Sequence, residues 1–140
     1  MDIKEIERII DYHFGDSGLL AVAFTHSSLA HEQNIKSNER LEFLGDSILN
    51  MIASRHLYDS HSDTEGIMTE KRKSIVSMKP LSDAIDKLDL SKFLQLGRNT
   101  KEVSSNMKAD LFEAIVAAIY LDGGIEPAGR FIMKSLCLCT

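Results

Sequence analysis

The chain has 140 residues, of which 44% are hydrophobic and 26% are charged, as is ordinary for one soluble globular domain, and we expect that domain to span residues 1–140. Its net charge of −5 by itself argues against a nucleic-acid-binding protein, because carboxylates repel phosphates. The sequence shows no bilayer-spanning stretch, no secretory signal and no disulfide framework, since Cys137 and Cys139 are nearly adjacent, so we expect a cytoplasmic location.

Helical periodicity recurs along the whole chain, and no stretch alternates with the two-residue period of a strand. The predicted helices cover residues 3–14, 39–58, 67–78, 80–88, 90–96, 106–122 and 127–138. A short apolar segment at 19–24 leads into a polar stretch at 25–38, which we interpret as a loop. Ser37 or Asn38 is expected to cap the second helix, and Gly123 and Gly124 to end the sixth. The predicted fold class is all-α.

Three carboxylates lie on one side of the helix predicted at 39–58. At 100° per residue, Glu39, Glu42 and Asp46 fall within about 60° of one another, with no cation in the helix three or four residues away to offset their repulsion. Acids in this pattern are most often the solvated face of an amphipathic helix. Phe43 beside them, and Gly45 in the helix interior, favour instead a covered or occupied surface, because an interior glycine usually marks a close approach.

Two further carboxylates, Asp110 and Glu113, are one turn apart near the start of an almost wholly apolar helix. One interpretation places them at the surface, where acids stabilise a helix N-terminus. The other interpretation is burial, because Glu113 lies between Phe112 and Ala114, and buried carboxylates are usually paired or bound to metal. Two helices with clustered carboxylates would form a hard oxygen-donor site suited to Mg²⁺ or Mn²⁺ rather than Zn²⁺.

The residues "NERLEFLGDSIL" at 38–49 closely resemble the signature motif of the ribonuclease III family. "FTHSS" precedes them, and "EGIMTEKRKSIVS" and "KADLFEAIVAAIYLDGG" follow in the family's order, so the likeness runs from about residue 19 to 124. It implies a helical bundle that forms a symmetric homodimer. It also implies an Mg²⁺-dependent endonuclease, with Mn²⁺ able to substitute, that cuts double-stranded RNA during RNA processing, including that of rRNA, and leaves 5′-phosphate and 3′-hydroxyl ends.

The resemblance also implies roles for individual residues. Positions matched to the family's motifs make Glu42, Asp110 and Glu113 the metal ligands, and Asp46 and Glu113 the catalytic residues. Bound ions would make water more acidic and neutralise charge on the phosphate, in place of a histidine general base.

Three other positions have family counterparts. Glu39 and Glu65 match acids that organise the site and RNA contacts without binding metal directly. Phe43 matches an aromatic residue that inserts into a socket of the partner subunit, as an isologous interface would require. The alternative for Phe43 is an ordinary core aromatic at the edge of a helix.

The basic residues offer candidates for phosphate contact. The densest basic cluster comprises Lys71, Arg72, Lys73 and Lys79. A charge run is more often a solvated face, which is the alternative here. Lys108 is two residues from Asp110, where it could lower the pKa of that carboxyl or contact the scissile phosphate.

Many members of the family carry a C-terminal double-stranded RNA-binding domain, which is absent from this sequence, so the chain is a natural short form or part of a longer protein. The main hypothesis is a double-strand-specific endoribonuclease that needs no organic cofactor and no membrane. The rival is a non-catalytic homodimeric module of the same fold that binds double-stranded RNA or serves assembly. The intact set of carboxylates disfavours this rival, and a small-molecule phosphohydrolase has little support without histidine ligands.

Overall fold

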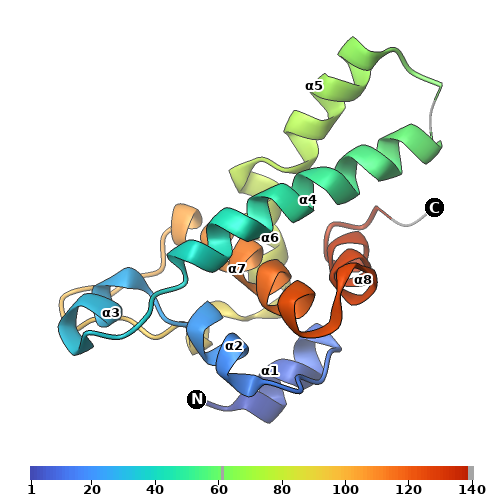
Figure 1. The fold of residues 1–140 in the computed structure, drawn as a ribbon. Coiled ribbons are helices and arrows are strands. Elements are labelled where there is room, and N and C mark those ends of the chain that lie inside the picture. The colour runs from blue at the N-terminus through green and yellow to red at the C-terminus, as the bar shows by residue number, and fades with distance from the viewer. Residues whose placement is uncertain (61, 139–140) are drawn as a thin grey trace.

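The computed structural model describes residues 1–60 and 62–138, and the secondary structure of these residues is helical throughout (Figure 1). The helices are α1 (Ile3–Ile10), α2 (Ser17–Ala23), α3 (Ser27–Gln33), α4 (Glu39–Ser60), α5 (Glu65–Ile75), α6 (Met78–Leu88), the 3₁₀ turn η1 (Ser91–Phe93), α7 (Ser105–Gly123) and α8 (Ile125–Ser135). In the described residues the only β-type pairing is one isolated bridge between Thr25 and Gln95. The all-α prediction is therefore confirmed, while Cys139 lies outside the described residues.

Helix α7 forms the centre of the core. It packs against α2, α4, α6 and α8 (Figure 1). All of its residues from Leu111 to Ile119 are apolar and fully buried, except the half-buried Glu113. An α-helix that is apolar on all sides must be covered on all sides, which the sequence pattern had predicted. The C-terminal part of α4 and the helix α5 extend beyond this core as a hairpin (Figure 1). In the described part of the chain, no helix has the length and apolarity needed to cross a bilayer.

The interpretation of residues 25–38 as a loop was wrong, because α3 forms there. Its cap is His26, whose Nδ1 accepts a hydrogen bond from the backbone N–H of Ser28 at 3.1 Å. Contacts with a distant segment hold the helix: the Gly97 N–H donates to Ser28 Oγ at 2.9 Å, and the Arg98 N–H donates to Glu32 at 2.6 Å. Seven residues form too short a helix to be stable alone, so tertiary contacts decide this element.

Two other predicted helices are shorter than expected. Helix α1 ends at Ile10 rather than near residue 14, because Asp11 adopts a left-handed conformation with φ of 57°. The helix predicted at 90–96 is reduced to the turn Ser91–Phe93. There the chain pairs with the α2–α3 connection instead, and the Gln95 N–H donates to the Phe24 carbonyl at 2.8 Å.

Of the two residues predicted to cap α4, Ser37 accepts a hydrogen bond from the first helical residue, whereas the side chain of Asn38 binds the end of α2 instead. Ser37 Oγ accepts a hydrogen bond from the Glu39 N–H at 3.2 Å. Asn38 is buried, and its side-chain amide donates to the Ala23 carbonyl at 3.1 Å while its backbone N–H donates to the Thr25 carbonyl at 2.9 Å. These bonds tie the first turn of α4, which carries the acidic residues, to the end of α2.

Asp122, near the end of α7, holds the connection between α1 and α2. Its carboxylate accepts hydrogen bonds from the Tyr12 hydroxyl at 2.6 Å and from the backbone N–H groups of Gly15 at 3.0 Å and Asp16 at 2.8 Å. One side chain therefore satisfies three donors from a segment more than a hundred residues away in sequence.

We expect Asp122→Ala to lower the free energy of unfolding by about 2 kcal/mol, because it leaves these donors without their acceptor. Urea denaturation monitored by circular dichroism would measure the change. Asp59→Ala is the matched control, since the exposed pair of Asp59 with Arg55 should contribute no more than about 0.5 kcal/mol. Equal effects of the two substitutions would contradict a structural role for Asp122.

Candidate metal centre

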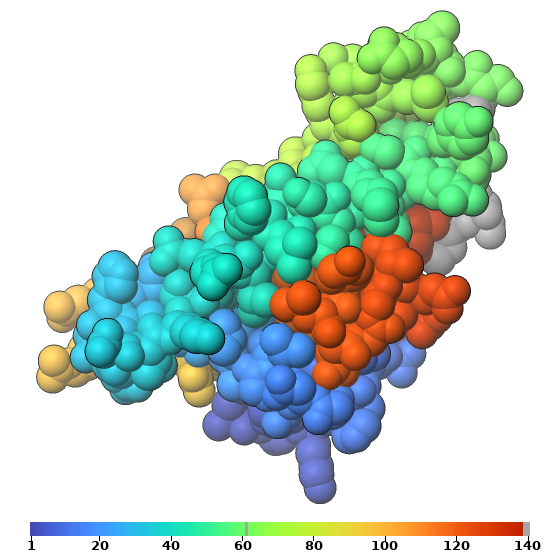
Figure 2. Space-filling model, viewed as in Figure 1, coloured from blue at the N-terminus to red at the C-terminus, as the bar shows by residue number. Residues whose placement is uncertain are grey.

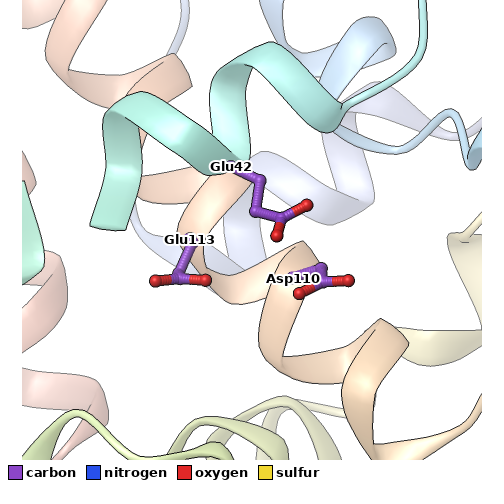
Figure 3. A group of neighbouring side chains, drawn as sticks. All are labelled: Glu42, Asp110 and Glu113. Carbon is purple, nitrogen blue, oxygen red and sulfur yellow. The ribbon is translucent and has the colours of Figure 1, made fainter. Parts of the chain in front are cut away.

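Three carboxylates converge where α4 crosses the first turns of α7. Glu42 comes from α4, and Asp110 and Glu113 come from α7, so residues far apart in sequence meet at one place (Figure 3). One carboxylate oxygen from each of the three lies within 4.8 Å of the others, and all three side chains are half-buried. The exposed helix N-terminus considered for Asp110 and Glu113 is therefore not their environment.

Gly45 allows the two helices to approach this closely. A Cβ atom built on Gly45 would lie 1.8 Å from the backbone oxygen of Glu113 and 2.6 Å from its carbonyl carbon. Any side chain at this position would overlap the backbone of α7 at the residue that supplies a carboxylate. The expectation that Gly45 marks a close approach is confirmed, and the approaching element is α7.

The carboxyl groups repel one another and retain protons. Burial, a hydrogen bond with Asp46 and the charges of the neighbouring acids raise the pKa of Glu113 to about 9. Burial and the adjacent Asp110 raise the pKa of Glu42 to about 7. Burial also raises the pKa of Asp110, although a hydrogen bond with Glu42 and, to a smaller extent, the nearby His26 act against this rise. A bound cation would compensate the same unfavourable environment of the charged carboxylates.

The chemistry of the donors fits a hard divalent cation. All the ligand atoms in the cluster are carboxylate oxygens, which Mg²⁺ and Mn²⁺ prefer, and no thiolate or imidazole belongs to it. A cation with two positive charges would offset both the burial and the repulsion that raise the pKa values of Glu42 and Glu113, and its binding would release their protons. The cluster can therefore hold a metal ion, and the identity of that ion stays a prediction.

Asp46 and Glu39 lie beside this cluster. Asp46 is exposed on α4 and forms the hydrogen bond with Glu113 noted above. Glu39 is exposed at the start of α4, where Ser37 Oγ donates to its carboxylate at 3.0 Å, and its charge contributes to the raised pKa of Glu42. Both acids therefore belong to the same electrostatic environment as the three convergent carboxylates, while their roles in a reaction stay predictions.

Sequence reasoning missed two polar neighbours of the cluster. The Asn50 side-chain amide donates to the Asp46 carbonyl at 2.9 Å and lies 3.4 Å from its carboxylate. The spacing of four residues along one helix could have indicated this contact. His26, whose charge acts on Asp110, comes from the connection between α2 and α3, and no local pattern indicates its proximity.

Glu65 does not join the cluster within the chain. It begins α5 and lines a hollow of 410 Å³ together with Ser54 and Tyr58 from the far part of α4. Tyr58 is roughly 24 Å along the helix axis from Glu42, at 1.5 Å per residue. The structure therefore places Glu65 at the projecting hairpin (Figure 1), and a supporting role for it stays a prediction.

The cations of the basic cluster on α5 and α6 form ion pairs or hydrogen bonds with neighbouring side chains. The ion pairs are Lys71–Asp63 at 2.6 Å, Lys73–Glu70 at 3.1 Å and Lys79–Asp83 at 3.2 Å. Arg72 Nη1 donates to Ser54 Oγ at 2.9 Å, which joins α5 to α4. Phosphate contact by these cations would require them to leave or share these partners, and it stays a prediction.

Lys108 is directed toward α6. Its Nζ lies 2.7 Å from Asp86 Oδ1, and only 21% of its side chain is exposed. The ammonium group is therefore held by Asp86 rather than by Asp110, which corrects the expectation that it lowers the pKa of Asp110. Contact between Lys108 and phosphate stays a prediction.

Phe43 is 81% exposed, so the alternative of a core aromatic is wrong. Figure 2 shows α4 running openly along one face of the molecule, from the blue N-terminal helices to the green α4–α5 hairpin. Beside Phe43 is a hollow of 890 Å³ whose apolar lining includes Leu19, Val22, Leu44 and Leu121. A large aromatic side chain in water next to an apolar hollow is typical of an interaction surface.

Comparison with known proteins places this geometry in a family. A family model described as Ribonuclease-III-like matches residues 16–138. The protein named Ribonuclease 3 of Caldanaerobacter subterraneus subsp. tengcongensis is 44% identical over 136 residues, which cover 91% of this chain and 59% of that protein. Ribonuclease 3 of Clostridium perfringens is 36% identical over 141 residues, which cover 96% of this chain and 60% of that protein. The chain thus spans about three-fifths of the length of these curated relatives.

Solved structures agree with the sequence relatives. A nuclease domain of ribonuclease III from Campylobacter jejuni, described as flexible in the region involved in dimer formation, superposes with a TM-score of 0.89 at 30% identity and covers 96% of each chain. A second structure of the nuclease domain from the same organism has a TM-score of 0.85 at 27% identity and covers 96% of this chain and 93% of that one.

Proposed function

Because the chain belongs to the ribonuclease-III-like family, we propose that it is an Mg²⁺-dependent endoribonuclease that hydrolyses phosphodiester bonds of double-stranded RNA. The observation that supports this function most directly is the convergence of Glu42, Asp110 and Glu113 within 4.8 Å. A module that only bound RNA would gain nothing from acids held together at the cost of raised pKa values. The expected products carry 5′-phosphate and 3′-hydroxyl ends.

Three carboxylates would bind the cation, and a fourth would accept a proton. Glu42, Asp110 and Glu113 would hold Mg²⁺, which when bound makes water more acidic and neutralises charge on the phosphate. Asp46 is close enough to Glu113 to raise the pKa of that carboxyl, and its own side chain is exposed, so substrate and water can reach it. We propose that its carboxylate orients the attacking water and takes a proton from it.

Cleavage of a long RNA duplex in the presence of Mg²⁺ tests this function directly. The expected result is discrete double-stranded fragments with 5′-phosphates, none in EDTA and none from a single-stranded RNA of the same length. Mn²⁺ is expected to restore cleavage after EDTA treatment. If the chain bound the duplex without cutting it in either metal, the non-catalytic RNA-binding module would be the correct function.

We also propose that the chain forms a symmetric homodimer through the face of α4 that carries Phe43. The exposed ring and the adjacent apolar hollow on the same face suit a self-complementary contact, in which each Phe43 would enter the hollow of the other copy. Two carboxylate clusters would then be available to the two strands of one duplex.

Phe43→Ala is expected to weaken the dimer about 30-fold, because a buried aromatic anchor commonly contributes about 2 kcal/mol or more. Sedimentation velocity over a range of concentrations would give the dissociation constant. Met78→Ala removes another exposed apolar side chain, at the start of α6, and should leave the constant unchanged. A monomeric wild-type chain, or equal dimerisation by the Phe43 variant, would contradict this interface.

A further inference from the structure

A second surface feature lies away from the carboxylates, between α1, α6 and α8. It is a hollow of 580 Å³, the lining of which includes the apolar side chains of Ile9, Leu88, Pro127, Phe131 and Met133. No lining residue belongs to α4 or α7, the two helices that supply the carboxylates. Occupation of this hollow would therefore leave the candidate metal centre open.

The hollow continues along the seam between α6 and α8. A neighbouring hollow of 470 Å³, next to the connection between α5 and α6, has four of the same lining residues: Ala84, Lys87, Ser135 and Cys137. The two hollows therefore adjoin one another, and we call them together the α6–α8 groove. Two adjoining hollows bordered by two helices suit an amphipathic segment of polypeptide, whose apolar side chains can occupy both hollows.

The α6–α8 groove is basic although the chain as a whole has a net charge of −5. Its lining contains four cations, Lys79, Lys87, Arg130 and Lys134, against two carboxylates, Asp11 and Asp83. Asp83 pairs with Lys79, while Lys134 is 3.9 Å from Asp11 with both side chains highly exposed, so that second pair is weak.

Lys87 and Arg130 are the two cations of the groove that have no carboxylate partner. Both are exposed, and among the described residues neither lies within ion-pair distance of an acid. Lys87 comes from α6 and Arg130 from α8, so they lie on two different helices that border the apolar floor. Free positive charge beside an apolar floor is complementary to a ligand that has both apolar and acidic side chains.

We propose that the α6–α8 groove binds an acidic amphipathic helix of a partner protein. Apolar side chains of that helix would contact the floor around Ile9, Leu88 and Phe131, and its Asp or Glu side chains would pair with Lys87 and Arg130. Duplex RNA complements this surface less well, because its phosphates would match the cations but nothing on its exterior would fill an apolar floor. The proposal does not depend on the proposed nuclease function.

Selection from a display library of random helical peptides on the whole folded chain would test this proposal. The expected peptides combine apolar residues at helical spacing with Asp and Glu. For a synthetic peptide of this kind, fluorescence anisotropy should show binding weakened about tenfold or more in the double variant Lys87→Glu, Arg130→Glu. The matched control is Lys4→Glu, Lys101→Glu, which changes the net charge equally at two exposed cations outside the groove and should change affinity less than about twofold.

The remaining outcomes would overturn the proposal. They are the absence of any enriched peptide, enrichment of peptides without acidic residues, and equal weakening in the two double variants. Binding of duplex RNA, measured in parallel, distinguishes an RNA ligand from an acidic peptide. If RNA binding falls in the groove variant alone while binding of the selected peptides is unaffected, the groove contacts RNA. Circular dichroism would establish that both double variants are folded.

Discussion

Replacing Glu113 by glutamine is expected to abolish RNA cleavage and at the same time to stabilise the metal-free protein. Glutamine keeps the shape of the side chain but removes a charged ligand, and we expect a loss of about 10³-fold or more in rate, equivalent to several kcal/mol. The stabilisation follows from the same carboxyl group, because burial, Asp46 and the other acids raise its pKa to about 9.

The sign of the effect of pH follows from proton binding. Between about pH 5 and pH 9 the folded, metal-free chain retains the Glu113 proton that the unfolded chain has released, since the ordinary pKa is 4.5 and the folded value is about 9. The free energy of unfolding therefore falls as the pH rises through this window, and Glu42, with a pKa of about 7, adds to the fall in its lower part. Glutamine has no proton to lose, so Glu113→Gln should reduce this dependence.

Thermal unfolding in EDTA at pH 5.5, 7.0 and 8.5 would measure the difference, at about 3 °C in Tm for each kcal/mol. Added Mg²⁺ should raise the Tm of the wild type most at the highest pH and should have little effect on Glu113→Gln. Glu126→Gln, on the exposed surface of α8, is the control for loss of one negative charge. Wild-type cleavage by Glu113→Gln would refute the proposed role of Glu113, and a pH-independent Tm would contradict the raised pKa.

Gly45→Ala adds a single methyl group at the contact between α4 and α7, and we expect it to reduce both the stability of the fold and the binding of metal. The new Cβ would lie 1.8 Å from the Glu113 carbonyl oxygen, and a backbone atom within a packed helix cannot move aside cheaply. The helices would have to separate, at a cost of about 3 kcal/mol, and the separation would move Glu113 away from Glu42. Both stability and metal binding should therefore be lost together.

Gly66→Ala is a matched control for this prediction. Gly66 is also helical, in the first turn of α5, but a Cβ atom there would meet nothing within 4 Å. Its replacement should be neutral or stabilise the chain by about 0.5 to 1 kcal/mol, since alanine is the better helix former. Urea denaturation with and without Mg²⁺ would compare the two variants. A Gly45→Ala protein with wild-type stability and a wild-type response to Mg²⁺ would exclude the role assigned to Gly45.

The sequence by itself determined the helical class, the burial of α7 and the two groups of acids, three on α4 and two on α7. These features depend on local periodicity: a helix that is apolar on every side must be buried, and acids at a spacing of three or four residues must share a face. Gly45 carried information of the same kind, because a glycine inside a helix indicates a close approach, although it does not indicate which element approaches.

Only the tertiary structure decided which of these elements meet. The convergence of Glu42 with Glu113 depends on where α4 crosses α7, and α3 depends on contacts with Gly97 and Arg98 that no local pattern predicts. For the same reason Lys108 is paired with Asp86 instead of lying beside Asp110, although Asp110 is only two residues away. Successive residues of a helix point in different directions, so a side chain's partners are set by the neighbouring helices rather than by its neighbours in sequence.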